Sequence, residues 1–299
     1  MKELQPERPV LGVYRQKFKF KDDVYYLRDF KNLESFYDFA SVKGLEDYSS
    51  HDSNSAFRGT KDFPEAIKFA REGWPEGLKG LEYYEDIAYR DYAIREAQNI
   101  WDVNLNVTGA YVDIGSYLEG VPECMCDFVS KDINKFADVV INPSCSAWVK
   151  KETIFDRGRE ILKLVDVLEK NHIKTRVSCI DIFCMKDINY GDRYIEKVLI
   201  KDYNEILDQN RIVFPLCNVG YTRRFAFAGL ESEEDIREDF GCPYAGYGYP
   251  GNIENLPDEL WKSGYANTHT FLFDDINRTR KNVKETKEKI KKLIEEGDE

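Results

Sequence analysis

The clearest hydrophobic pattern in the chain lies between residues 136 and 183. An apolar run at 136–141 predicts a buried strand. Apolar positions from Ile161 to Leu168 form one broad stripe, which predicts a helix packed on a sheet. A second run at 175–183 contains several β-branched residues and predicts another strand. A strand, a helix and a strand in this order form a right-handed parallel crossover, so we expect an α/β fold.

Residue types also suggest where this helix begins and ends. The Thr153 hydroxyl can cap the first turn, where Asp156 adds a favourable negative charge. Asn171 can take the left-handed conformation that often follows the last turn. We therefore expect the helix to lie between Thr153 and Asn171.

Shorter helical patterns precede this unit. One apolar face over 32–42 predicts a short helix, and Asp62 and Gly73 are suited to cap and end another. A longer helix is expected over 78–101, and residues 112–118 predict a single helical turn.

These patterns suggest a division of the chain near residue 130. Alternation at 10–20 predicts an early strand, but most predicted elements before residue 130 are helical. We interpret residues 1–130 as an N-terminal, mainly helical region docked on the core. Residues 131–299 would then form the α/β domain.

The C-terminal part adds two strands and a charged helix. Residues 197–201 and 268–273 predict strands, and residues 278–296 predict a helix with a thin apolar stripe. The expected fold class is α/β, with an open, mainly parallel sheet flanked by helices.

One polar loop lies where such a fold places its ligands. Asn142, Ser144 and Ser146 alternate directly after the strand at 136–141. Ligands of open α/β sheets bind at the carboxyl ends of the strands. An alternative is that these short polar side chains only stabilise the turn.

Charge narrows the range of partners. The 299 residues include 43 Lys and Arg against 55 Asp and Glu, which gives a net charge of −12. Such a surface repels phosphate backbones, so non-specific nucleic-acid binding is not expected. An acidic protein can instead imitate DNA towards a basic partner, although the acids here are scattered.

Cysteine usage suggests a reducing compartment. Seven cysteines make an odd count, and the charged start MKELQPERPV does not have the composition of a secretory signal. No apolar run approaches the ~20 residues that span a bilayer. We expect a cytoplasmic protein with reduced thiols and no membrane segment.

The strand and loop at 136–146 resemble the start of a von Willebrand factor A-type domain. In that family a buried strand ends in Asp-x-Ser-x-Ser and leads into an amphipathic helix. Here Asn142-Pro143-Ser144-Cys145-Ser146 stands in that place, with asparagine instead of the leading aspartate.

The wider chain is similar to an uncharacterised family of phage- and prophage-encoded proteins, with a degenerate domain of this type. The resemblance covers roughly residues 60–230. It rests on four separated blocks, GWPEG (73–77), VDIGSYLEGVPECM (112–125), RGREILKLVDVLE (157–169) and YTRRFAF (221–227).

The A-type resemblance implies a metal-ion-dependent adhesion site. Such a site binds Mg²⁺ through serine hydroxyls, a loop threonine and aspartates, and a carboxylate of the partner completes the shell. Its candidate residues here are Asn142, Ser144, Ser146 and Thr222. Asn142 removes a negative charge beside the cation, so we expect no resident cofactor and keep Mg²⁺ as the candidate metal.

Three functions are compatible with these observations. The first is a non-catalytic binding or scaffolding protein of a phage or mobile element, which acts in a bacterial host and contacts a protein partner through the strand-end face. Arg223, Arg224, Tyr247 and Tyr249 are its candidate partner-binding residues. The second is a hydrolase-like enzyme with a metal- or Cys145-centred site. The third is an acidic inhibitor of a host nucleic-acid-binding protein.

Overall fold

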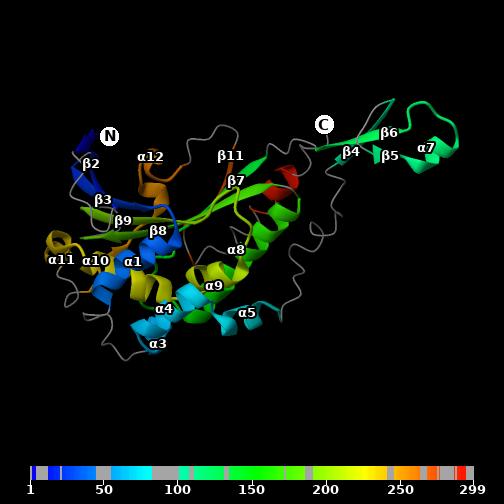
Figure 1. Cartoon of the computed structure of the whole chain (residues 1–299). Helices are drawn as coiled ribbons and strands as arrows, with labels where there is room; N and C mark the ends of the chain where they lie inside the picture. The colour runs from blue at the N-terminus through cyan, green and yellow to red at the C-terminus, as the bar shows by residue number, and fades with distance from the viewer. Residues whose placement is uncertain are drawn as a thin grey trace.

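The fold is a mixed sheet with most of its helices on one face (Figure 1). The computed structural model of the chain describes residues 2–4, 13–20, 22–44, 55–82, 101–107, 111–130, 135–171, 173–185, 191–240, 246–262, 268–274, 276, 286 and 288–293.

The main sheet has the strand order β1-β2-β3-β9-β8-β7-β11, and β10 pairs with β8 beside this path. Its strands are β1 (Lys2–Leu4), β2 (Arg15–Phe20), β3 (Asp23–Phe30), β7 (Phe136–Ile141), β8 (Lys174–Cys184), β9 (Arg193–Lys201), β10 (Tyr249–Pro250) and β11 (Thr268–Phe273). The strands predicted at 136–141, 175–183 and 268–273 are thereby confirmed.

The expectation of a mainly parallel sheet is wrong. The pairs β11–β7, β7–β8 and β3–β9 are parallel, whereas β8–β9, β2–β3, β1–β2 and β10–β8 are antiparallel. Consecutive strands separated by only a few residues, such as β8 and β9, pair antiparallel because a parallel connection needs a dozen residues or more.

The strands β1 to β3 extend the same sheet that contains β7 to β9 and β11. The N-terminal region therefore contributes strands to the core as well as helices packed on it. The boundary at residue 130 does not follow the sheet.

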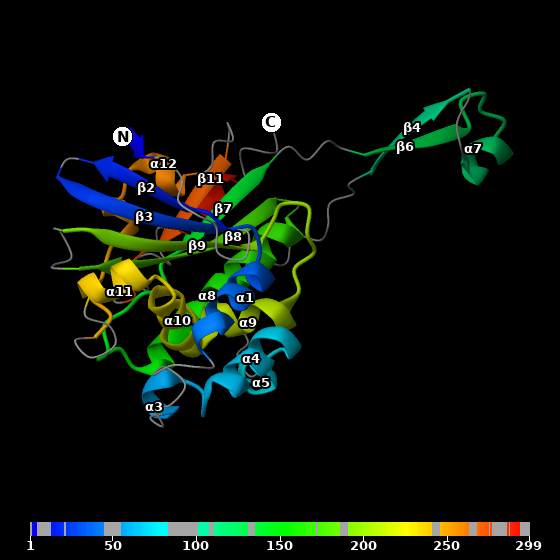
Figure 2. The same cartoon turned by 60° about the vertical axis from the view of Figure 1, so that its left-hand side comes forward.

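One face of the sheet carries a layer of helices (Figure 2). Phe36, Leu164, Phe214 and Phe225 pack there against strand residues such as Val139. The helical segments of the body are α1 (Leu33–Gly44), α3 (Ser55–Arg58), α4 (Phe63–Glu72), α5 (Pro75–Glu82), α8 (Lys151–Lys170), α9 (Gln209–Cys217), the π-helix η1 (Tyr221–Ala226), α10 (Phe227–Glu231), α11 (Glu234–Phe240), the 3-10 helix η2 (Ile253–Asn255) and α12 (Asp258–Trp261).

The opposite face is covered by a shorter segment. Val140, Ile180 and Ile195 point to this side, where Ile253 and Leu260 from η2 and α12 cover them. Both faces of the central strands are thus buried, because successive side chains of a strand point to opposite faces. This explains why the apolar runs are unbroken rather than alternating.

Helix α8 forms the predicted crossover between β7 and β8, but its ends differ from those predicted. It begins one turn earlier, after Lys150, whose side chain makes no capping hydrogen bond. Asn171 does follow the last turn, but at a φ of −96° rather than in the left-handed region. The apolar stripe determines the helix, and its ends follow from packing and backbone hydrogen bonds.

A small second sheet forms an arm that lies away from the main body in both views (Figures 1 and 2). It has the order β4-β6-β5 and carries a short helix. The predicted helical turn is confirmed, whereas Trp101 begins a strand instead of ending the helix expected over 78–101. Residues 83–100 of that prediction lie outside the described residues. The elements of the arm are β4 (Trp101–Asn106), β5 (Tyr111–Val112), α7 (Ile114–Leu118) and β6 (Met125–Ser130).

The C-terminal helix expected over 278–296 is only partly described, and residues 288–293 are helical. Among the described residues, no helix combines the length and the apolar character required to cross a membrane. Cys124, Cys145, Cys179, Cys184 and Cys217 form no disulfide bond.

Candidate functional site at the strand ends

The predicted loop lies where the parallel strands β7 and β11 end side by side. Asn142 directly follows β7, and Asp274 directly follows β11. The Asn142 amide donates hydrogen bonds to Asp274 Oδ1 at 2.9 Å and to Gly251 O at 2.7 Å, and its Oδ1 accepts one from the Ser144 amide at 3.1 Å. Asn142 is buried, so its side chain holds three segments together at the edge of the sheet.

Two predicted residues meet on an aspartate that the sequence did not single out. Ser144 Oγ and Thr222 Oγ1 donate to Asp181 Oδ1 at 3.1 and 3.0 Å. The amide of Ile182 in turn donates to Ser144 Oγ at 2.9 Å. The π-helix η1 carries Thr222 into this cluster, and single wide turns of this kind often occur at functional sites.

Asp181 is fully buried on β8, and burial raises its pKa to about 7. The hydrogen bonds from Thr222 and Ser144 and the charge of Arg157 oppose this rise without cancelling it. Ser144 and Thr222 occupy one carboxylate oxygen, whereas Oδ2 has no hydrogen-bond partner among the described residues. A proton on Oδ2 is therefore compatible with the geometry.

A second buried acid faces Asp181 across the strands. Glu196 of β9 pairs with Asp181 in the β8–β9 register and is fully buried. Burial, and next the charge of Asp181, hold the pKa of Glu196 well above its usual range. Neither acid stood out in the sequence, because each lies inside an apolar strand. An acidic residue within such a run could have indicated a buried carboxyl group, since Asp and Glu are rarely buried.

The cluster does not fit the Mg²⁺ site that the resemblance implied. Both hydroxyls donate to a single carboxylate, and the Asn142 side chain donates two hydrogen bonds within the protein while its Oδ1 accepts one from the Ser144 amide. Ser146 is exposed, and its hydroxyl accepts a 3.5 Å bond from the Trp148 backbone amide. Among the described residues, no three His, Cys, Asp or Glu side chains are grouped closely enough to hold a metal. Mg²⁺ requires several hard oxygen ligands, and a carboxyl group that retains its proton is a weak one.

Next to this cluster lies a pocket of about 420 Å³. It brings together Ser144, Ser146 and Thr222 of the predicted metal set with Arg223, Tyr247 and Tyr249 of the predicted partner-binding set.

The ring of Tyr247 stacks on Phe227 at 3.7 Å, which fixes one wall of the pocket, whereas Tyr249 is exposed. The loop at 246–250 thus contributes its aromatic residues to the same face as the strand ends.

The two predicted arginines have different roles. Arg223 lines the pocket, where its guanidinium lies 4.2 Å from the Phe57 ring centroid and donates to Phe57 O and Ser146 O. Arg224 is fully buried, donates to the Thr60 and Lys61 carbonyls and does not line this pocket. Successive residues of η1 point in different directions, which the sequence pair alone could not show.

Cys145 lies in the pocket wall, but its environment is unsuited to a nucleophile. Burial raises the pKa of its thiol, although Arg223 and Arg157 pull it down. Arg223 Nη2 is 3.9 Å from Cys145 Sγ. Because the thiolate is the reactive form, a raised pKa makes this thiol less reactive at neutral pH.

One exposed residue at this face escaped the sequence reasoning. Trp148 is 92% exposed, two residues beyond Ser146 in the same loop. A tryptophan so exposed is unusual, because this side chain is normally highly buried. We define the strand-end face as the pocket at Arg223, Tyr247 and Tyr249 together with Trp148.

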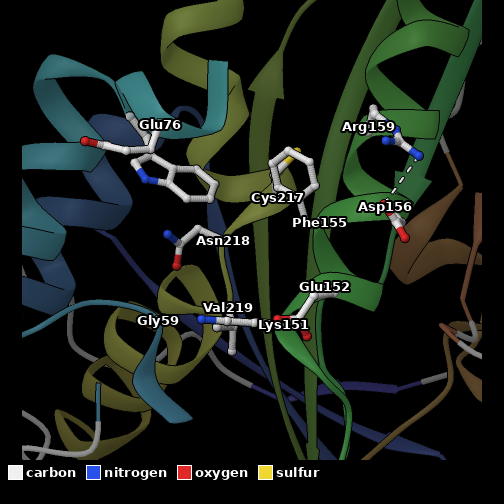
Figure 3. Close-up of a pocket in the computed structure, with 11 residues that line it drawn as sticks. Gly59, Glu76, Lys151, Glu152, Phe155, Asp156, Arg159, Cys217, Asn218 and Val219 are labelled. Atoms are coloured by element: carbon white, nitrogen blue, oxygen red, sulfur yellow. Dashed lines mark ion pairs between the residues drawn. The ribbon is translucent and has the colours of Figure 1, made fainter. Parts of the chain in front are cut away.

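A second pocket, of about 510 Å³, lies beside the first turn of α8 (Figure 3). Its aromatic lining is Trp74 and Phe155, whose rings meet edge to face at 6.1 Å. The charged lining residues have both signs and include the Arg159–Asp156 ion pair. None of the site residues predicted from the sequence lines this second pocket.

Comparison with known proteins gives a family relation. The profile of a family described as a domain of unknown function, DUF7192, matches residues 11–296. The chain belongs to this family. No curated protein and no solved structure matches it. The DUF7192 match covers the arm and every strand of the main sheet except β1, so sheet and arm are parts of one family unit.

Proposed function

We propose that the chain is a non-catalytic binding protein that contacts a partner protein through the strand-end face. The observation that carries this proposal is the 92% exposure of Trp148 beside a preformed pocket. Tryptophan, tyrosine and arginine dominate the binding energy of protein interfaces. Trp148 and Tyr249 are exposed here, and Arg223, although 4% exposed, lines the pocket.

The pocket favours an acidic group of the partner. The Arg223 guanidinium donates to the carbonyl oxygens of Phe57 and Ser146 and to Cys145 Sγ, and no carboxylate of the described residues forms an ion pair with it. An arginine without a neutralising acid attracts a carboxylate in a direct, charge-assisted contact. The chemistry of Cys145 supports the non-catalytic role, because its raised pKa disfavours the thiolate.

The relation to von Willebrand factor A-type domains remains part of this proposal. It is supported by the order of β7, the Ser144 loop, α8 and β8, and by the meeting of Ser144 with Thr222. In this interpretation Asp181 and its proton occupy the place of the metal. Origin in a phage or mobile element and action in the bacterial cytoplasm are further parts of the proposal.

Replacing Trp148 tests the proposal directly. The immobilised full-length chain is incubated with bacterial extract, and bound proteins are quantified for the wild type, Trp148→Ala and Ile206→Ala. Ile206 is the matched control because it is also 92% exposed and lies outside the strand-end face. Neither change removes a buried contact, so both variants should fold normally.

We expect a bound protein whose recovery falls at least tenfold with Trp148→Ala and is unchanged with Ile206→Ala. A tenfold loss corresponds to about 1.4 kcal/mol, and fewer than about a third of interface residues cost more than about 1 kcal/mol when truncated. Equal recovery by all three chains would show that Trp148 is not part of the contact.

A further inference from the structure

The arm, residues 101–130, exposes a set of apolar side chains on its short helix α7. Ile114, Tyr117 and Leu118 are 69%, 64% and 78% exposed. Their spacing of three and four residues places them on one side of the helix. Val112 and Val121, which flank the helix, are also exposed. Large apolar side chains that gather on one exposed face mark an interaction surface.

Helix α7 is held at both ends although it buries none of its own residues. Asp113 caps the N-terminus by accepting from the Ser116 amide at 3.1 Å and from the Ser116 hydroxyl at 2.6 Å.

The C-terminus of α7 closes through Gly120, whose φ of +71° suits glycine best. Gly120 N donates to Tyr117 O, and Val121 N donates to Ser116 O, which together form a Schellman motif. Because the caps hold the helix in its folded form before binding, little conformational entropy would be lost when a partner covers its apolar face.

The charge of the arm selects among possible occupants of this face. Residues 101–130 contain five acids and no Lys, Arg or His. The acids are Asp102, Asp113, Glu119, Glu123 and Asp127. Two copies of the arm would bring like charges together, and a phosphate-bearing surface would be repelled as well. A partner with positive charges around an apolar groove meets both requirements.

We propose that the arm inserts the Ile114–Tyr117–Leu118 face into an apolar groove, rimmed by Lys and Arg, on a partner protein. This is the recognition mode in which a helix lays its apolar side in a groove. The surface is separate from the strand-end face, so the proposal does not depend on the proposed function. With both surfaces in use, the chain connects two proteins.

A photo-reactive amino acid at position 117 of the full-length chain tests the contact. After cross-linking in bacterial extract, the attached protein is identified by mass spectrometry and purified. Its Kd is then measured against the wild type, Leu118→Ser, Tyr117→Ser and the control Ile206→Ser.

We expect each arm variant to weaken binding at least tenfold, and the control to leave the Kd unchanged. These side chains are exposed, so the variants should keep the melting temperature of the wild type.

Charge reversal provides the second arm of the experiment. The double variant Glu119→Lys/Glu123→Lys should weaken binding at least tenfold, and added salt should weaken the wild-type complex. Both side chains are exposed, and a lysine at a helix C-terminus is favourable, so α7 should stay folded.

Tighter binding of the charge-reversed chain would contradict the proposal that Lys and Arg surround the partner's groove. A cross-link only to a second copy, with a dimer in sedimentation that Leu118→Ser abolishes, would replace the partner by self-association. Absence of any cross-link, or a Kd unaffected by both serine variants, would overturn the proposal.

Discussion

At the scale of single residues, the centre of the protein is the pair of buried acids Asp181 and Glu196. A buried carboxylate is costly unless it is paired with a cation or takes up a proton. Two hydroxyls satisfy one oxygen of Asp181, and the neighbouring acid adds repulsion rather than compensation. The pKa values of both acids are raised, so each takes up a proton more readily than an exposed carboxyl group and the core is sensitive to pH.

The variant Asp181→Asn should remove part of this pH sensitivity. The folded-state pKa of Asp181, about 7, is higher than its ordinary value, so the folded state binds the proton more tightly than the unfolded state. The resulting stability is fully present below about pH 4 and is lost as the pH rises to about 7. Denaturant unfolding at pH 5 and pH 7.5 should show the wild type losing about 2 kcal/mol more stability than the variant.

Asn at position 181 can still accept both hydroxyl bonds, so the variant should fold. The exposed Asp38→Asn is the control and should follow the wild-type pH profile. Parallel pH profiles for the wild type and Asp181→Asn would show that Asp181 is ionised throughout.

At the scale of elements, the close approach of α8 and α9 fixes the position of the loop at 142–146. Gly158 of α8 faces the backbone of α9, where a β-carbon would stand 2.2 Å from Leu216 O and 2.6 Å from Cys217 Sγ. On the same helix, Arg157 donates to Asn142 O at 2.8 Å. The helix contact and the loop are therefore fixed together.

Gly158→Ala should destabilise the protein by about 1–3 kcal/mol, because the added methyl group meets backbone that cannot move aside. Gly115→Ala is the matched control: it also lies in a helix, but its β-carbon would meet only Asp113 Oδ2 at 3.8 Å. Urea unfolding of both variants measures the difference. A Gly158→Ala protein as stable as the wild type would mean that α8 and α9 are further apart.

At the scale of the whole molecule, buried ions tie the first strands to the C-terminal half. Glu233 accepts hydrogen bonds from Arg28 of β3 and, at 2.9 Å, from Arg15 of β2. Arg15 also pairs with the more exposed Asp235 at 2.7 Å. The Arg28 and Glu233 side chains are almost fully buried, so each charge requires the other.

Glu233→Gln should cost about 3–5 kcal/mol, because it leaves the buried charge of Arg28 without its counter-ion. Asp235→Asn provides the comparison: it removes a partner of the same Arg15, but at a side chain that is 61% exposed. That variant should change stability by about 1 kcal/mol or less. Chemical denaturation at neutral pH distinguishes the two, and similar losses for both would contradict the burial of the Glu233 network.

The sequence alone determined the local elements of this protein. The apolar run at 136–141 and the stripe from Ile161 to Leu168 could be identified because hydrophobic period follows directly from backbone geometry. The Asp62 cap and the Gly73 stop also follow from the sequence, and the structure has both. The polar loop at 142–146 was recognised as a strand end for the same reason.

Only the tertiary structure decided what these elements form together. Strand pairing is set between segments far apart in the chain, so the antiparallel hairpins and the membership of β1 to β3 in the main sheet were not visible locally. Asp181 lies within hydrogen-bonding distance of Ser144 and Thr222 only because β8 and η1 pack beside the loop that follows β7. Burial then gives Asp181 a raised pKa, and burial is a property of the fold rather than of any single residue.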